Sequence, residues 1–171
     1  MPQETKTGSN ETRRQIILSF VLVLLLALLD QWTKQLALEM LFEPPRVIII
    51  SGFFNLVPVW NPGISFGLFG ESGRFGAILL TGIAFAAAIG LPLVARHWPG
   101  VPRLGAVMMA GGALGNAIDR VIHGKVVDFI DLHWQDWHWP AFNLADSAIT
   151  IGAGMVIIAN LFASGNNERL E

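Results

Sequence analysis

The sequence predicts an all-α membrane protein with four transmembrane helices, and three observations favour this fold class. The chain has 171 residues, a length typical of one domain. Apolar residues make up 53% of it and charged residues only 14%, against about 25% charged in soluble domains. Several stretches approach the roughly 20 apolar residues that a helix needs to cross a bilayer. The net charge of −2 argues against nucleic acid as a partner, and the absence of cysteine excludes disulfides and thiolate metal sites.

Hydrophobic runs place the four helices. We expect them at about residues 14–40, 74–96, 101–122 and 141–163. The first contains the apolar run 16–29, which only Ser19 interrupts, and the second is uncharged apart from its ends. The third is shorter and rich in small residues, with Gly111 and Gly115 at the spacing that lets membrane helices pack closely. The fourth follows Pro140 and includes Asp146.

Basic residues set the orientation of these helices. They precede the first helix, flank the short second connection and follow the fourth helix: Lys6, Arg13, Arg14, Arg96, Arg103 and Arg169. Because cytoplasmic loops carry an excess of Lys and Arg, we expect both termini to be cytoplasmic. The polar residues 1–11 are predicted to be disordered. The two long connections, about 41–74 and 121–141, would then face outward.

The N-terminal segment also has an alternative interpretation. Residues 12–17 partly imitate a twin-arginine export signal, and the apolar run after them could be the core of a signal peptide. That core is followed by Asp30, Gln31 and Lys34 rather than by a small-x-small cleavage site. The pattern therefore favours a retained first helix.

Charged residues at membrane depth are functional candidates, because an unpaired charge there is costly. Asp30 and Lys34 lie one turn apart on one face near the outer end of the first helix. They could form an ion pair that closes the helix end, or Asp30 could line a site. Asn116, Asp119 and Arg120 occupy the outer end of the third helix, where we favour a role in holding a site together over direct chemistry.

Asp128 and Asp146 are the candidates for chemistry. An antiparallel return of the chain would bring the start of the fourth helix beside the end of the third, at one depth. Two neighbouring carboxylates cannot both ionise comfortably, so one keeps a proton while the other acts as a base. Such a pair can activate water without a metal. Spacing alone leaves open that Asp146 only complements the helix dipole and that Asp128 is a polar residue of an interfacial strand.

Histidines and tryptophans crowd the second outer connection. His123, His133 and His138 could with Asp131 or Asp136 suggest zinc, but no pair has the helical i, i+4 spacing of a zinc motif. The interleaved tryptophans are typical of an aromatic belt at the lipid headgroups. We therefore expect no metal and no cofactor.

Five sequence blocks, in order between about residues 16 and 162, resemble the lipoprotein signal peptidases (signal peptidase II), a family of bacterial membrane aspartic proteases. The blocks are Asp30-Gln-Trp-Thr-Lys34, Asn61-Pro-Gly-Ile-Ser-Phe-Gly67, Gly111-Gly-Ala-Leu-Gly-Asn-Ala-Ile-Asp-Arg120, Val126-Val-Asp-Phe129 and Phe142-Asn-Leu-Ala-Asp-Ser147. Pro62 departs from the small residue that more usually follows the asparagine of the second block, and it is expected to stiffen that turn.

The resemblance implies one membrane-embedded peptidase domain over residues 1–171, with a small extracytoplasmic β-sheet cradle built largely from the first outer loop. It implies that Asp128 and Asp146 form the catalytic pair. The positions that match substrate-binding or supporting residues are Asp30, Lys34, Asn61, Gly63, Asn116, Asp119, Arg120, Asn143 and Ala145.

The resemblance also implies the reaction and its setting. The enzyme would remove the signal peptide from diacylglyceryl-modified prolipoproteins by cleavage just before the lipidated cysteine. It would act as a monomer in the bacterial cytoplasmic (inner) membrane, in contact with lipid, with its active site at the outer, periplasmic face. Globomycin-type cyclic peptides would inhibit it.

Two other functions fit parts of the pattern. A proton-coupled small membrane transporter would also use membrane carboxylates, but it predicts acids near the midplane and an internal repeat. A chaperone-like protein that only binds lipidated partners leaves the clustered polar residues without a mechanism. The acids gather at one end of the helices and no internal repeat is evident, which disfavours the transporter, and it too leaves the clustered polar residues without a mechanism.

Overall fold

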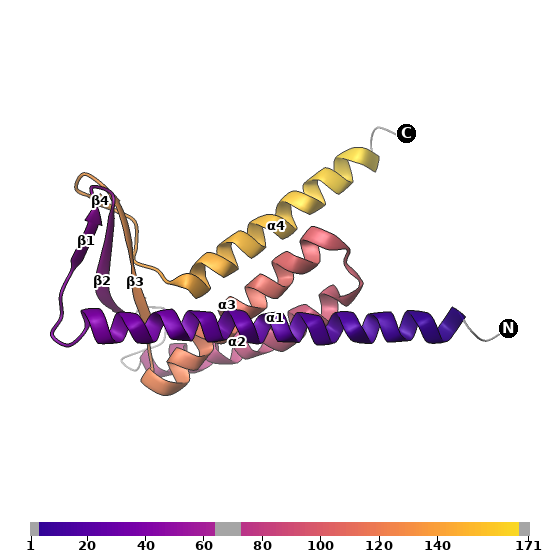
Figure 1. Ribbon diagram of the computed structural model, residues 1–171, viewed down its shortest axis with the longest axis horizontal. Coiled ribbons are helices and arrows are strands. Elements are labelled where there is room, and N and C mark those ends of the chain that lie inside the picture. The colour runs from indigo at the N-terminus through magenta and orange to yellow at the C-terminus, as the bar shows by residue number, and fades with distance from the viewer. Residues whose placement is uncertain (1–3, 64–72, 168–171) are drawn as a thin grey trace.

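The computed structural model describes residues 4–63 and 73–167, which form four long helices and a small sheet (Figure 1). In chain order the elements are α1 (Glu4–Leu41), β1 (Ile48–Ser51), β2 (Phe54–Asn61), α2 (Gly73–Val94), η1 (Ala95–His97), α3 (Gly100–His123), β3 (Val126–Trp134), β4 (Trp137–His138) and α4 (Leu144–Asn167). The sheet stands at the C-terminal end of α1, and the start of α1 and the end of α4 lie at the opposite end of the molecule. That both termini are cytoplasmic stays a prediction.

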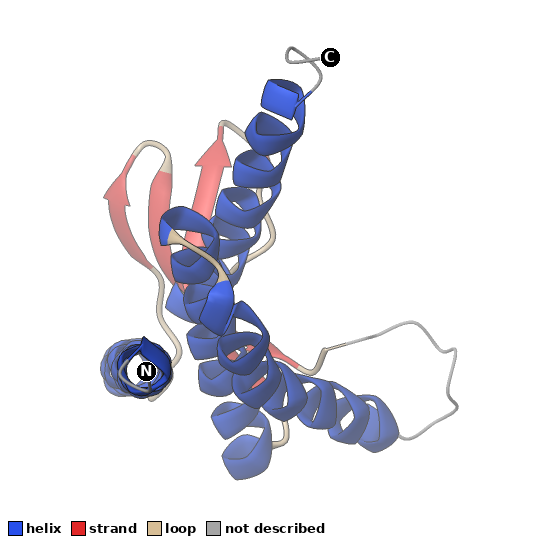
Figure 2. Ribbon diagram, turned by 90° about the vertical axis from the view of Figure 1, so that its right-hand side faces the viewer, coloured by secondary structure: helices blue, strands red, loops and turns tan. Residues whose placement is uncertain are grey.

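Helix α3 is the centre of the bundle, because it packs against each of the other three helices, which contact one another much less. Figure 2, which looks along α1, shows α1 to one side of the other three helices. Glycines allow these close approaches. A Cβ on Gly111 would collide with Leu26 of α1, and a Cβ on Gly115 would collide with the Asp30 carboxylate. The predicted small-residue motif therefore allows α3 to pack closely against α1.

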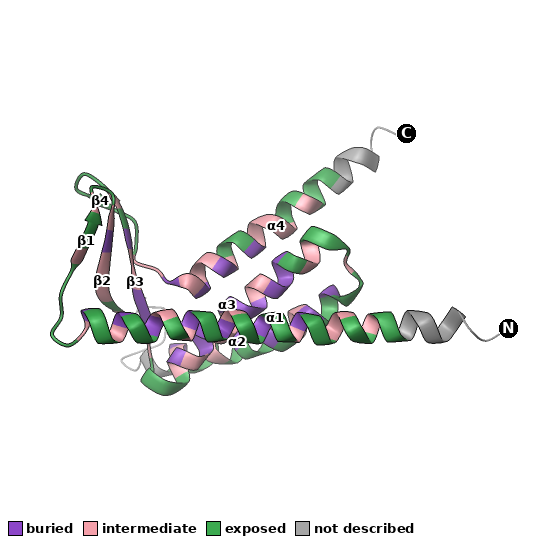
Figure 3. Ribbon diagram, in the orientation of Figure 1, coloured by how far each residue is buried: buried purple, intermediate pink, exposed green. Residues whose placement is uncertain are grey.

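The outer faces of the helices are apolar and exposed (Figure 3). Within the described residues, three helical stretches are long and apolar enough to cross a membrane: Asn10–Leu41, Phe75–His97 and Leu144–Phe162. Helix α3 is not among them. It carries polar residues such as Asn116 and Asp119, which are buried against its neighbours. A fourth span therefore stays a prediction.

The sheet is antiparallel, with strand order β1-β2-β3-β4. The expected strands from the first outer loop are present as β1 and β2, but the second outer connection supplies the other two strands. Strand β3 pairs with β2 so that Asp128 lies opposite Val59. Asp128 is thus a strand residue as well as a candidate for chemistry, and the sheet fixes its position.

Two helix starts differ from the prediction. Helix α1 begins at Glu4, so residues 4–11 are helical where disorder was expected. Extending an existing helix adds a hydrogen bond for each residue ordered. Helix α4 begins at Leu144 rather than near residue 141, because Asn143 caps it, as described below.

Candidate active site

Asp128 and Asp146 both lie within hydrogen-bonding distance of one residue, Asn143. The Asn143 Nδ2 donates to Asp128 Oδ1 at 2.7 Å, and the backbone N–H of Asn143 donates to Asp146 Oδ2 at 3.2 Å. Asp128 and Asn143 are fully buried, whereas Asp146 is half-buried. The return of the chain from β3 into α4 thus joins the two predicted carboxylates.

The start of α4 explains why Asp146 is held firmly. Asn143 is the residue before the helix, and its Oδ1 accepts the N–H of Asp146 at 2.9 Å while Asp146 accepts the N–H of Asn143. This reciprocal pair is a capping box, which satisfies N–H groups that a helix start leaves without partners. Asp30 of α1 accepts a further one, the N–H of Ala145, at 2.9 Å.

A buried ion network lies behind the pair. The Lys34 ammonium is 2.8 Å from Asp30 Oδ2 and 3.0 Å from Asp119 Oδ2, with each of these side chains at most 2% exposed. It also donates to Asn116 Oδ1 at 2.9 Å. Asp30 thus forms the predicted pair with Lys34 and also holds the start of α4, while its role in lining a site stays a prediction.

Asp119 supports the strand that carries Asp128. Its Oδ2 accepts the N–H of Val127 at 2.9 Å. Its Oδ1 accepts from Gln31 Nε2 at 2.7 Å, and Gln31 also donates to the Gly115 carbonyl at 3.1 Å. Gln31 was not among the site residues predicted from the sequence. Its position next to Asp30 in the first sequence block is the feature that could have identified it.

Two more asparagines contact the carboxylates. Asn116 Nδ2 donates to Asp146 Oδ1 at 2.7 Å, and Asn61 Nδ2 donates to Asp128 Oδ2 at 2.8 Å. Asn61 is oriented by the N–H of Gly63, which donates to its Oδ1 at 2.8 Å. Gly63 has a φ of 89°, a conformation that favours glycine. The predicted residues of the first loop thus reach the site.

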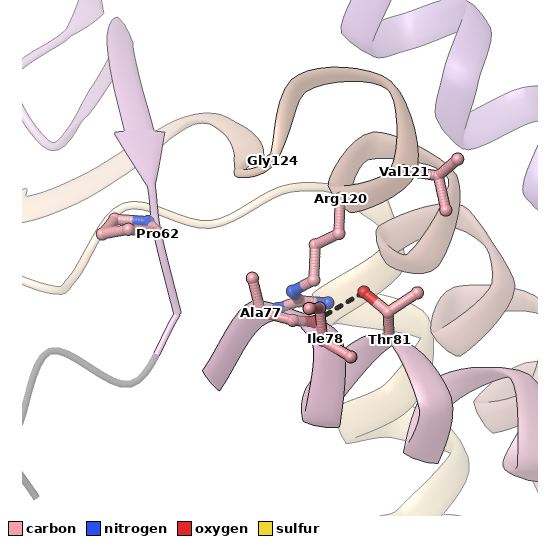
Figure 4. A pocket seen from close by; sticks show the side chains of 7 residues that line it. All are labelled: Pro62, Ala77, Ile78, Thr81, Arg120, Val121 and Gly124. Carbon is pink, nitrogen blue, oxygen red and sulfur yellow. Dashed lines mark hydrogen bonds between the residues drawn. The ribbon is translucent and has the colours of Figure 1, made fainter. Parts of the chain in front are cut away.

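Arg120 points from α3 toward α2 and borders a cavity of about 620 Å³ (Figure 4). One of its guanidinium nitrogens, Nη1, donates to the Asn116 carbonyl at 3.3 Å, and among the described residues its buried Nε has no hydrogen-bond partner. The cavity is lined by Pro62, Ala77, Ile78, Thr81, Arg120, Val121 and Gly124. The rest of the second sequence block, residues 64–67, lies outside the described residues.

The environment of Asp128 favours its protonated form. Burial raises its pKa to about 6, the hydrogen bonds from Asn61 and Asn143 oppose that rise, and the nearby charge of Asp146 adds to it. A carboxyl group that can hold a proton near neutral pH, beside a second carboxylate, is what acid–base chemistry on one substrate requires.

The histidine cluster is separate from this site. His138 Nδ1 bonds Asp131 Oδ1 at 2.8 Å, and the two rings of His133 and His138 stack at 4.9 Å. His123 lies against Trp60 instead. Within residues 4–63 and 73–167, no group of three histidines or carboxylates is arranged to hold a metal ion.

Comparisons with known proteins agree with this architecture. The family model for signal peptidase (SPase) II matches residues 22–162. A lipoprotein signal peptidase of Neisseria meningitidis serogroup C is 40% identical over 83% of this chain and 88% of its own length. One from Cellvibrio japonicus is 43% identical over 79% and 80%. A solved structure described as a bacterial membrane enzyme superposes with a TM-score of 0.69 at 29% identity, covering 86% of this chain and 90% of that one. The chain belongs to the signal peptidase II family, whose members are aspartic proteases.

Proposed function

We propose that this protein is the peptidase that removes signal peptides from diacylglyceryl-modified prolipoproteins, with Asp128 and Asp146 as its catalytic pair. One observation above all supports the proposal: Asn143 donates to both carboxylates, one through its side chain and one through its backbone. This bridging residue holds two carboxyl groups where a water molecule and a peptide bond can meet them.

The reaction needs one proton shared by the pair. The ionised carboxylate takes a proton from water while the water oxygen bonds to the scissile carbonyl carbon. The protonated partner donates to the carbonyl oxygen, which stabilises the tetrahedral intermediate. The C–N bond then breaks as the amine leaves with the proton taken from water, and the partner recovers its own proton. The products are the signal peptide, with a new carboxyl end, and the mature lipoprotein.

The cavity beside Arg120 is suited to the substrate main chain. It is mostly apolar, and the Nε of Arg120, which has no partner among the described residues, can donate to a peptide carbonyl there. Asn116 and Asn143 are engaged with the carboxylates. We therefore assign these two to orienting the pair and Arg120 to orienting the substrate.

The setting of the enzyme belongs to the same proposal. All four helices span the inner membrane, both termini are cytoplasmic, and the sheet and the catalytic pair face the periplasm. A scissile bond anchored by two acyl chains at the outer boundary would meet the pair at that depth. The enzyme acts as a monomer in contact with lipid, and globomycin-type peptides occupy its site.

The test is cleavage of a diacylglyceryl-modified prolipoprotein by the purified protein in detergent, with and without chelator. We expect chelator-resistant cleavage by the wild type and none by Asp128→Asn or Asp146→Asn, each with unchanged thermal stability. Full cleavage by either folded variant would refute the pair. Loss of cleavage with chelator would indicate a metal-dependent reaction and favour a metal site at the histidines.

Proton-coupled transport, the other candidate, is not supported by the family match. Transport would be favoured only if the folded wild type cleaved no substrate but took up a solute, and if Asp30→Asn abolished that uptake.

A further inference from the structure

Lys34 touches neither Asp128 nor Asp146, yet a chain of hydrogen bonds connects it to the pair. Its ammonium donates to Asn116 Oδ1 at 2.9 Å, and Asn116 Nδ2 donates to Asp146 Oδ1 at 2.7 Å. An ammonium has only donors, and an amide has one acceptor end and one donor end. Lys34 therefore fixes the side-chain amide of Asn116 with its oxygen toward the ammonium and its NH₂ group toward Asp146.

This orientation matters because an amide NH₂ group donates hydrogen bonds but cannot accept one from a protonated carboxyl group. A carboxylate facing it is stabilised when ionised, whereas a carboxylate facing the amide oxygen would be stabilised when protonated. Asn143 secures the same orientation, since its Nδ2 also points at Asn116 Oδ1, at 3.2 Å. Two donors thus hold the oxygen of Asn116 away from Asp146.

Three further features favour ionised Asp146 over ionised Asp128. Asp146 lies in the first turn of α4, where the helix dipole favours a negative charge. It accepts a backbone N–H there at 3.2 Å. It is half-buried, whereas Asp128 is 1% exposed in a strand. The charged groups that interact with Asp146 are Asp128 from β3 and Arg120 from α3. Lys34 and Asp30 from α1 contact its neighbours Asn116 and Ala145, and Asp119 from α3 pairs with Lys34.

We propose that Lys34 is a positioning residue which, by fixing the amide of Asn116, keeps Asp146 as the ionised member of the pair and leaves the shared proton on Asp128. This inference rests on the proposed function. In the reaction, Asp146 then takes the proton of the attacking water and passes it to the leaving amine. Asp128 donates its proton to the carbonyl oxygen and recovers it when the C–N bond breaks.

The test is the pH dependence of kcat/KM, whose acidic limb reports ionisation of the base in the free enzyme. Asn116→Leu removes the donor to Asp146 and leaves both ion pairs of Lys34 in place. We expect its acidic limb to move to higher pH by about one unit, a ten-fold change in the ionised fraction at a given low pH. Asn116→Asp should move it the same way, because it places a second acceptor beside Asp146.

Lys34→Met should also shift the limb upward, since only the longer bond from Asn143 then holds the oxygen of Asn116 away from Asp146. Because Lys34 acts through Asn116, the double variant Lys34→Met/Asn116→Leu should shift it no further than Asn116→Leu alone. If Lys34→Met does not fold, the two Asn116 variants decide the question. Lys125→Met, a lysine that lies over Trp60, is the matched control with a wild-type profile.

A wild-type profile for folded Asn116→Leu would overturn the inference, and an additive shift in the double variant would overturn the route through Asn116. A role for Lys34 in stability alone would lower the melting temperature of Lys34→Met and leave its profile unchanged. Asp128→Asn and Asp146→Asn are measured alongside. Full cleavage by either would mean that the proposed pair itself is wrong, a result distinct from failure of this inference.

Discussion

The close crossing of α3 and α4 offers a sharp test of how the site is positioned, through the substitution Gly112→Ala. A Cβ on Gly112 would lie 2.9 Å from Ile149 Cγ1 and would collide with the carbonyl oxygen of Ala145. Carbon atoms in contact prefer about 3.5–4.0 Å. The first turn of α4, which carries Asp146, must therefore move by roughly 0.6–1 Å.

That movement has two expected costs. Overpacking of this kind destabilises by about 1–3 kcal/mol, which for a chain of this size lowers the melting temperature by roughly 2–12 °C. The bond from Asn116 Nδ2 to Asp146 Oδ1, now 2.7 Å, would lengthen beyond the roughly 3.2 Å of a good hydrogen bond. A misplacement of about 1 Å at a catalytic group can cost about 100-fold in rate.

The assay compares Gly112→Ala with Gly154→Ala in detergent, by thermal unfolding and by cleavage of lipidated substrate. Gly154 lies in α4 too, but nothing lies within 4 Å of where its Cβ would be. Alanine there should gain up to about 1 kcal/mol from helix propensity and keep full activity. Equal melting temperatures and equal activities for the two variants would show that the crossing does not set the geometry of the pair.

Three further predictions concern the polar groups. Burial raises the pKa of Asp128 to about 6. The stability that this carboxyl group contributes is therefore complete below its pKa in the unfolded chain and is lost as the pH rises through about 6. The melting temperature of the wild type relative to Asp128→Asn should fall between about pH 4 and pH 6. Burial raises the pKa of Asp131, but the hydrogen bonds from His138 and Asn55 outweigh that effect and leave the pKa below its ordinary value. The wild type should therefore lose stability relative to Asp131→Asn as the pH falls through the acid range. Melting temperatures of the two proteins that change in parallel with pH would contradict this. Asn143→Ala removes the cap of α4 and should cost about 1–2 kcal/mol together with most of the cleavage activity, so a variant that keeps its melting temperature would exclude the capping role.

The sequence predicted the helices and the contents of the site because both depend on local patterns. Apolar runs of membrane length and the spacing of Gly111 and Gly115 are visible without any tertiary information. The resemblance of five blocks supplied the polar residues in order, and the structure brings the described ones together. The catalytic role of Asp128 and Asp146 remains a proposal that cleavage assays decide.

The remaining features depend on contacts that no local pattern encodes. The start of α1 at Glu4 follows from propagation of a long helix through polar residues that composition alone marks as disordered. The capping of α4 by Asp30 joins residues 115 positions apart. The pairing of β3 with β2 depends on register across two outer connections, so the sequence indicated a sheet from the first loop and left open whether Asp128 lies in a strand.

The choice of neutral amides around the pair has a chemical reason. The described hydrogen bonds to Asp128 and Asp146 come from three asparagine side chains and one backbone N–H, while the ion pairs of Lys34 go to Asp30 and Asp119. A cation in direct contact with both carboxylates of the proposed pair would favour ionisation of both and remove the acid from the proposed reaction. Neutral amides position the two carboxyl groups without adding a charge, so the pair can keep one proton. The network thus keeps the lysine charge one residue away from the pair, where Lys34 orients the amide of Asn116 without contacting either carboxylate.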